Sequence, residues 1–137
     1  AVYGPVGEDG YPRLLYDKVT GVIDKEVAAY WREHYDLRHV LERDWKTLGP
    51  KLKGKLRIYA GDTDTFYLEE AVFLLEKFLR GAQDPSFEGV IEYGRRAPHC
   101  WTGCPEGRHP AAYYLPAMAD HITKTAPRGA DLKSWKY

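Results

Sequence analysis

Two short apolar segments with an amphipathic helix between them constrain the fold of this chain more than any other feature. Residues 56–60 and 89–93 have the length and apolar character of strands. Between them, apolar side chains recur every three or four positions over residues 68–79, and Arg80-Gly81 is typical of a helix end. A strand, a helix and a second strand form a crossover unit with parallel strands. The sequence therefore predicts an α/β fold with short parallel strands and a crossover helix.

The amino-terminal part, residues 1–50, is predicted to be a loop followed by helix. Glycine and proline are frequent in residues 1–23, which favours turns over regular structure. Helical spacing follows Asp24, a good capping residue, and we expect the helix to end at residues 49–50, which are Gly-Pro. Because Asp36 can cap a second helix, the pattern fits either one continuous helix or two.

The carboxyl-terminal part is predicted to be a loop over residues 94–110, a helix over residues 111–125 and a tail over residues 126–137. Pro116 falls inside the helical pattern, so it either kinks this helix or marks its start. The whole chain of 137 residues has the size of one domain, and we expect residues 1–137 to form a single unit.

The charge balance excludes some classes of partner. Twenty basic and twenty acidic side chains give no net charge, so the chain lacks the basic excess typical of proteins that bind nucleic acid. It also lacks an apolar run of about 20 residues, the length that a membrane-spanning helix needs. We therefore expect a soluble protein that binds neither nucleic acid nor membrane. The cellular compartment is not indicated, because the two cysteines lie only four residues apart and do not form the framework of a secreted domain.

Residues of catalytic type follow both predicted strands. Asp62 and Asp64 come directly after the first strand, and His99 lies a few residues after the second. Reactive groups of open parallel sheets gather at the carboxyl ends of the strands. A carboxylate beside an imidazole fixes the tautomer of the imidazole and makes it an effective general base. The sequence therefore predicts that a carboxylate and His99 meet within hydrogen-bonding distance.

These segments resemble a known family. Residues 56–64 have the sequence LRIYAGDTD and residues 97–101 have the sequence APHCW, with a helix and a strand between them. Over roughly residues 52–125, this order is similar to the carboxyl-terminal section of an α/β-hydrolase of the esterase kind. The resemblance implies a partial α/β-hydrolase fold and a small-molecule ester as substrate.

The resemblance also assigns roles to individual residues. In that family the acid follows the penultimate strand, commonly as Gly-x-x-Asp, which puts the acid on Asp64 when counted from Gly61, with Asp62 as the alternative. It puts the base on His99, and it implies neither a cofactor nor a metal. The separation of 35 residues between Asp64 and His99 leaves room for one helix and one strand.

The nucleophile of that family has no counterpart in this chain. The family places a serine in a Gly-x-Ser-x-Gly turn ahead of the acid, whereas Ser86 and Ser134 both follow Asp64 and lack such a turn. A two-stranded parallel sheet also leaves its edges unpaired. We therefore expect a carboxyl-terminal portion of a longer hydrolase, inactive alone, whose partner is the remainder of that hydrolase or a second chain covering the sheet edge.

Two other functions fit parts of the same sequence. The chain could be a noncatalytic α/β module that serves in interactions. Alternatively, Asp62-Thr63-Asp64-Thr65 resembles the Asp-x-Asp-x-Thr start of haloacid-dehalogenase-like phosphotransferases. In that family the first aspartate attacks phosphorus, the second acts as acid and base, and magnesium binds between them. Thr65 stands where that family usually has glycine, and no acidic pair follows a later strand.

The cysteines allow two further interpretations. Thiolate and imidazole are preferred zinc ligands, so Cys100 and Cys104 could bind zinc with His99 and His109. Two features argue against this site: His99 and Cys100 are adjacent in sequence, and the chain has no Cys-x-x-Cys pair. A disulfide between Cys100 and Cys104 is the second interpretation.

Overall fold

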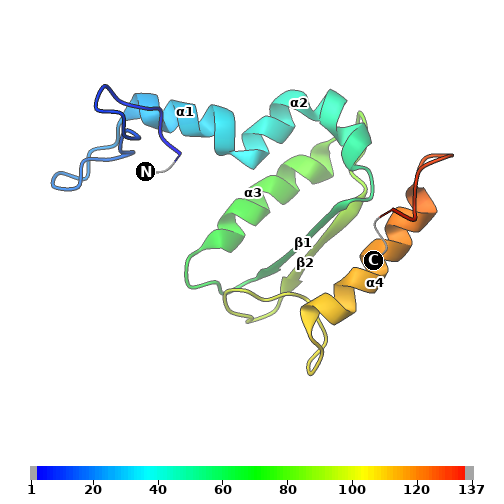
Figure 1. Cartoon of the computed structure of the whole chain (residues 1–137). Helices are drawn as coiled ribbons and strands as arrows, with labels where there is room; N and C mark the ends of the chain where they lie inside the picture. Colours follow the sequence, from blue (N-terminus) through cyan, green and yellow to red (C-terminus); the bar gives the residue numbers. More distant parts are fainter. Residues whose placement is uncertain (1–2, 135–137) are drawn as a thin grey trace. The chain divides into compact units, whose positions relative to one another are not determined.

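A computed structural model describes residues 3–134 of the chain, which is traced in Figure 1. Its elements are α1 (Lys25–Tyr35), α2 (Leu37–Leu52), β1 (Leu56–Gly61), α3 (Leu68–Gly81), β2 (Gly89–Gly94) and α4 (Pro110–Thr125). The two strands pair with each other in a parallel sheet. The predicted mixed α/β class, with parallel strands, a helix between them and further helices before them, is therefore confirmed.

The chain divides into two compact units. The first, here called the helical unit, consists of Ala1–Ile58 and Glu70–Ile91. The second, here called the loop unit, consists of Tyr59–Glu69 and Glu92–Tyr137. Both strands continue from the helical unit into the loop unit, so the carboxyl ends of β1 and β2 belong to the loop unit.

Aspartates begin the first two helices. The Asp24 side chain accepts hydrogen bonds from the backbone N–H groups of Glu26 and Val27, and the Asp36 side chain accepts one from His39. Such caps satisfy amides that have no partner inside the helix. Asp36 also ends α1 in an extended conformation, with φ −76° and ψ 97°. Of the two possibilities that the sequence left open, the structure has two helices.

The predicted end of the second helix at Gly49-Pro50 is wrong, because α2 continues to Leu52. Pro50 lies in the last turn, where its missing N–H removes one hydrogen bond. Gly49 fits because of close packing: a Cβ atom there would lie 2.8 Å from Cγ of Pro85 and 2.9 Å from the ring of Trp45. Tertiary packing therefore outweighs the local stop signal.

The core of the helical unit is formed by side chains from α1, α2, α3 and β2. Within this unit α3 runs alongside the first halves of the two strands (Figure 1). Trp45 donates a hydrogen bond from Nε1 to the carbonyl oxygen of Pro85 at 2.7 Å. Its ring meets that of Phe78 edge to face, with 5.5 Å between centroids. The buried apolar side chains of this unit are Val27, Leu41, Trp45, Leu79 and Ile91.

The amino-terminal loop has the turns that the sequence predicts. Isolated bridges join Val6 to Pro12 and Tyr16 to Ile23. Gly10 adopts φ 78°, in the left-handed region that glycine tolerates best, and its N–H donates to the Gly7 carbonyl oxygen. The loop is thus ordered by short backbone contacts.

α4 begins at Pro110, so the alternative in which this helix starts at Pro116 is wrong. Pro110 occupies a first-turn position, where a missing N–H is not needed, and Nδ1 of His109 accepts a hydrogen bond from the Ala111 N–H. Four large apolar side chains of this helix remain exposed, namely Tyr113, Leu115, Met118 and Ile122. Between residues 3 and 134, no helix has both the length and the apolar character needed to cross a bilayer.

Candidate functional site

Backbone contacts join the segments that follow the two strands. The N–H of Asp62 donates to the carbonyl oxygen of Gly94 at 3.1 Å. Thr63 donates twice to the carbonyl oxygen of Ala97, from its N–H at 3.2 Å and from its hydroxyl at 2.9 Å. These bonds hold the loop after β2 against the end of β1.

Gly61, the last residue of β1, makes this close approach possible. A Cβ atom at this position would lie 2.3 Å from the carbonyl oxygens of both Ala97 and Pro98. Such distances are far inside van der Waals contact, so any side chain at residue 61 would displace the segment that leads to His99.

Asp64 and His99 meet at the centre of this arrangement. Nδ1 of His99 lies 2.8 Å from Oδ2 of Asp64. Because an ionised carboxylate only accepts hydrogen bonds, Nδ1–H is the donor, which leaves Nε2 without a proton in the neutral ring. Asp64 is 9% exposed, whereas the His99 side chain is 37% exposed. The predicted meeting of a carboxylate with His99 is confirmed, and the carboxylate is that of Asp64.

The surroundings of Asp64 favour its ionised form. The hydrogen bond from His99 lowers the pKa of Asp64 below its ordinary value of 3.8. The backbone N–H of Phe66 donates to Oδ1 at 2.7 Å and acts in the same direction, while burial acts in the opposite direction. Both carboxylate oxygens are therefore engaged, and the charge is available to stabilise an imidazolium.

Phe66 also contacts the imidazole. The two rings meet edge to face, with 4.9 Å between centroids and 76° between planes. A role for Phe66 was not predicted from the sequence. The available signal was an aromatic residue two positions after the candidate acid, inside a turn.

Asp62 does not join this pair. Its Oδ1 atom is buried without a hydrogen-bond partner in the part of the chain that the structure describes. A phosphotransferase would need the carboxylates of Asp62 and Asp64 together at a phosphate and a magnesium ion, whereas both oxygens of Asp64 are engaged by His99 and Phe66. The geometry therefore favours the acid–base interpretation of Asp64.

Aromatic side chains support the loop that carries His99. The ring of Tyr59, on β1, lies 6.3 Å from that of Trp101 and 5.2 Å from that of Tyr114 on α4. The Tyr114 hydroxyl donates to the carbonyl oxygen of Thr102. Burial raises the pKa of Tyr114 to about 12, and Tyr59 adds to this shift. Tyr114 is consequently a neutral donor that fixes the loop.

The zinc and disulfide alternatives have no counterpart in the described residues. Cys100 and Cys104 are both free thiols. Among residues 3–134, no three histidine, cysteine, aspartate or glutamate side chains gather as ligands of a metal ion. His109 caps α4, which is a structural role.

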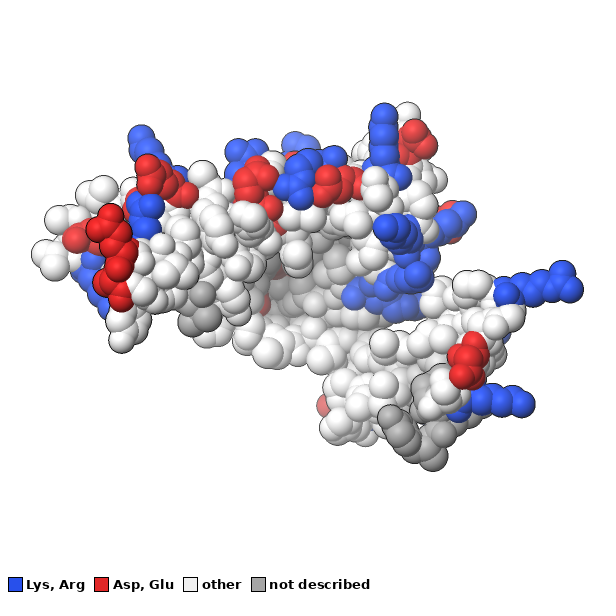
Figure 2. Space-filling model, turned by 45° about the horizontal axis from the view of Figure 1, so that its top comes forward, with Lys and Arg blue, Asp and Glu red and all other residues white. Residues whose placement is uncertain are grey.

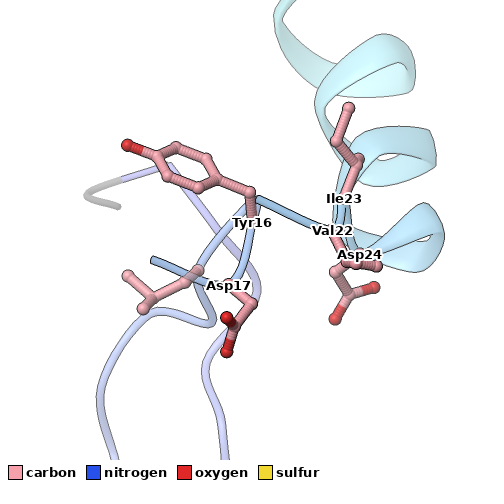
Figure 3. A pocket seen from close by; sticks show the side chains of 6 residues that line it. Tyr16, Asp17, Val22, Ile23 and Asp24 are labelled. Atoms are coloured by element: carbon pink, nitrogen blue, oxygen red, sulfur yellow. The ribbon is translucent and has the colours of Figure 1, made fainter. Parts of the chain in front are cut away.

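A separate hollow of about 370 Å³ lies in the helical unit (Figure 3). Its carboxylates serve local structure: Asp17 accepts hydrogen bonds from Val19 and Thr20, while Asp24 caps α1 and pairs with Arg13 at 2.6 Å. These contacts leave the hollow without a carboxylate free for chemistry.

Comparisons with known proteins leave the site to be interpreted from its own geometry. The chain matches no family model, no curated protein and no solved structure. The site consists of a buried carboxylate, an imidazole with one nitrogen held, and an aromatic ring against that imidazole. Such a pair can accept a proton from a hydroxyl group and return it to a leaving group.

Proposed function

We propose that this chain supplies the acid, Asp64, and the base, His99, of an ester-cleaving serine hydrolase of the α/β-hydrolase kind. The observation that carries the proposal is the 2.8 Å contact between Nδ1 of His99 and Oδ2 of Asp64. The order of β1, acid, α3, β2 and histidine supports it, because this order is the one that the resemblance implies.

The nucleophile belongs to a segment outside residues 1–137. Ser86 lies between α3 and β2 in the helical unit, where an isolated bridge joins it to Gln83. Ser134 lies beyond α4. Neither serine stands in a Gly-x-Ser-x-Gly turn. The chain alone is therefore expected to have no esterase activity.

The proposed reaction uses Nε2 of His99 twice. Nε2 takes the proton of the serine hydroxyl as the serine oxygen attacks the ester carbonyl carbon. Asp64 keeps its charge throughout and stabilises the imidazolium that forms. Nε2 then gives the proton to the leaving alcohol as the bond between carbon and that oxygen breaks, and water completes the cycle on the acyl-enzyme in the same way.

A serine-directed fluorophosphonate tests this proposal in the protein that carries both residues 1–137 and the serine segment. We expect labelling of the wild type and its loss in His99→Ala, because the serine is then not activated. His109→Asn is the matched control, since asparagine keeps the cap of α4. Labelling that is unaffected by His99→Ala contradicts the proposal.

A noncatalytic interaction module is the second candidate function. It is favoured by the exposed apolar side chains of α4 and of the amino-terminal loop, which suit contact with another protein surface. The same labelling experiment separates the two, because an interaction module does not react with the fluorophosphonate.

A further inference from the structure

Phe66 is held against the imidazole although its side chain is 67% exposed. An aromatic ring that is fixed by core packing loses most of its exposed area. The position of this ring therefore has a different cause, and much of its surface remains available to another molecule.

The turn after β1 fixes the backbone that carries the ring. Oδ1 of Asp64 accepts the N–H of Phe66 at 2.7 Å, and the Asp64 carbonyl oxygen accepts the N–H of Tyr67 at 3.1 Å. Tyr67 adopts φ 57°, in the left-handed region. The residue that holds His99 thus also fixes the turn that presents Phe66.

The chemistry of the proposed site also brings the leaving alcohol next to His99. Since Nδ1 of His99 is bonded to Asp64, the proton reaches the alcohol oxygen from Nε2 of the same ring. The group attached to that oxygen must therefore lie beside the imidazole, and Phe66 contacts this imidazole.

We propose that Phe66 determines substrate specificity by binding the alcohol part of the ester, so that esters of aromatic or other bulky apolar alcohols are preferred. This inference rests on the proposed function. Contact with an aromatic ring removes apolar surface from water and discriminates between substrates by about 10- to 100-fold.

Benzyl acetate and methyl acetate test the inference in the protein that carries both residues 1–137 and the serine segment. The two esters share the acyl group, and their alcohols have similar acidity. We expect Phe66→Ala to lower kcat/KM for benzyl acetate at least about 10-fold more than for methyl acetate, and Phe66→Leu to have a smaller effect.

Tyr67→Ala is the matched control. The Tyr67 side chain is 74% exposed, and among the described residues its ring has no contact with the imidazole. This variant should keep the wild-type ratio between the two esters. Unchanged thermal unfolding of Phe66→Ala shows that the comparison concerns folded protein.

Two outcomes overturn the inference while the proposed function stands. An equal loss on both esters means that Phe66 acts only on the position of His99, and unchanged kinetics mean that another part of the protein covers the ring. In both cases the wild-type protein is still labelled by the fluorophosphonate. Absence of labelling in the wild type overturns the proposed function itself, and this inference with it.

Discussion

Asp64 combines two structural tasks in one residue. One carboxylate oxygen holds His99, and the other holds the backbone N–H of Phe66. A nearly buried carboxylate is costly unless it accepts hydrogen bonds, and these two donors compensate the charge of Asp64. Two consequences can be measured, one on stability and one on activity.

The stability contributed by Asp64 should depend on pH. A carboxyl group whose folded-state pKa is lowered adds stability above its unfolded value, here about 3.8, and this stability is lost as the pH falls through the folded pKa. We expect Asp64→Asn to unfold more easily than the wild type at pH 7, with a difference that shrinks below pH 3.8. Urea unfolding at several pH values measures it.

His99→Ala provides the control for that experiment, because it removes the largest cause of the lowered pKa of Asp64. In this background the effect of Asp64→Asn at pH 7 should be smaller. An effect of Asp64→Asn that is the same at pH 7 and at pH 3 contradicts the prediction.

The two aspartates should differ in catalysis. In the protein that carries the serine segment, Asp64→Asn should lower kcat for an ester by roughly 10⁴-fold, because an amide stabilises the wrong tautomer of the histidine. Asp62→Asn should have little effect, since the Asp62 carboxylate does not contact His99. Initial-rate measurements decide, and the opposite result would identify Asp62 as the acid.

The order of strands and polar residues was sufficient to predict that a carboxylate after β1 meets His99, whereas the choice of Asp64 over Asp62 came from the family resemblance. Each follows a strand, and parallel strands end at the same edge of a sheet. Phe66 was not predictable in this way, because the direction of its ring depends on the backbone of the turn and on the Asp64 side chain. Local sequence patterns do not encode such a contact.

At the scale of elements, the helix α3 is stabilised by burying one of its faces. Leu79 is fully buried, whereas Leu74 on the same helix is 51% exposed. Leu79→Ala leaves a cavity and should lower the free energy of unfolding by about 2–5 kcal/mol.

Leu74→Ala is the matched control for Leu79 and should change the free energy of unfolding by less than about 0.5 kcal/mol. Urea unfolding compares the two variants directly. Equal losses for Leu74→Ala and Leu79→Ala would contradict the described burial of α3.

The starts of α1 and α2 were easier to predict than the end of α2. Asp24 and Asp36 carry their own capping groups, so the start of each helix depends on residues next to it in sequence. The end of α2 depends instead on how Gly49 packs against Pro85, which is 36 residues further along the chain. A local pattern does not contain that contact.

At the scale of the whole chain, exposed apolar side chains outnumber buried ones. Among residues 3–134, nineteen large apolar side chains are exposed and six apolar residues are buried. Figure 2 shows acidic and basic side chains mixed along the upper edge of one face, and white surface without charged side chains next to them. Such surfaces promote association.

The exposed face of α4 provides a test. We expect the isolated chain to associate in a concentration-dependent way in sedimentation velocity. The double variant Leu115→Lys/Met118→Lys should associate less while its unfolding temperature stays unchanged, because both side chains are exposed, by 61% and 50%.

Thr123→Lys/Thr125→Lys is the control for charge, since it adds the same two cations to α4 without removing apolar side chains. It should reduce association less than the other pair. One constant sedimentation coefficient at all wild-type concentrations would contradict the prediction.

The close approach at Gly61 has a consequence for how this sequence can vary. A library that encodes all twenty amino acids at residue 61 and is selected for hydrolysis should return glycine alone, because even alanine would meet two carbonyl oxygens at 2.3 Å. Exposed positions such as Val19, by contrast, should accept most amino acids in the same selection.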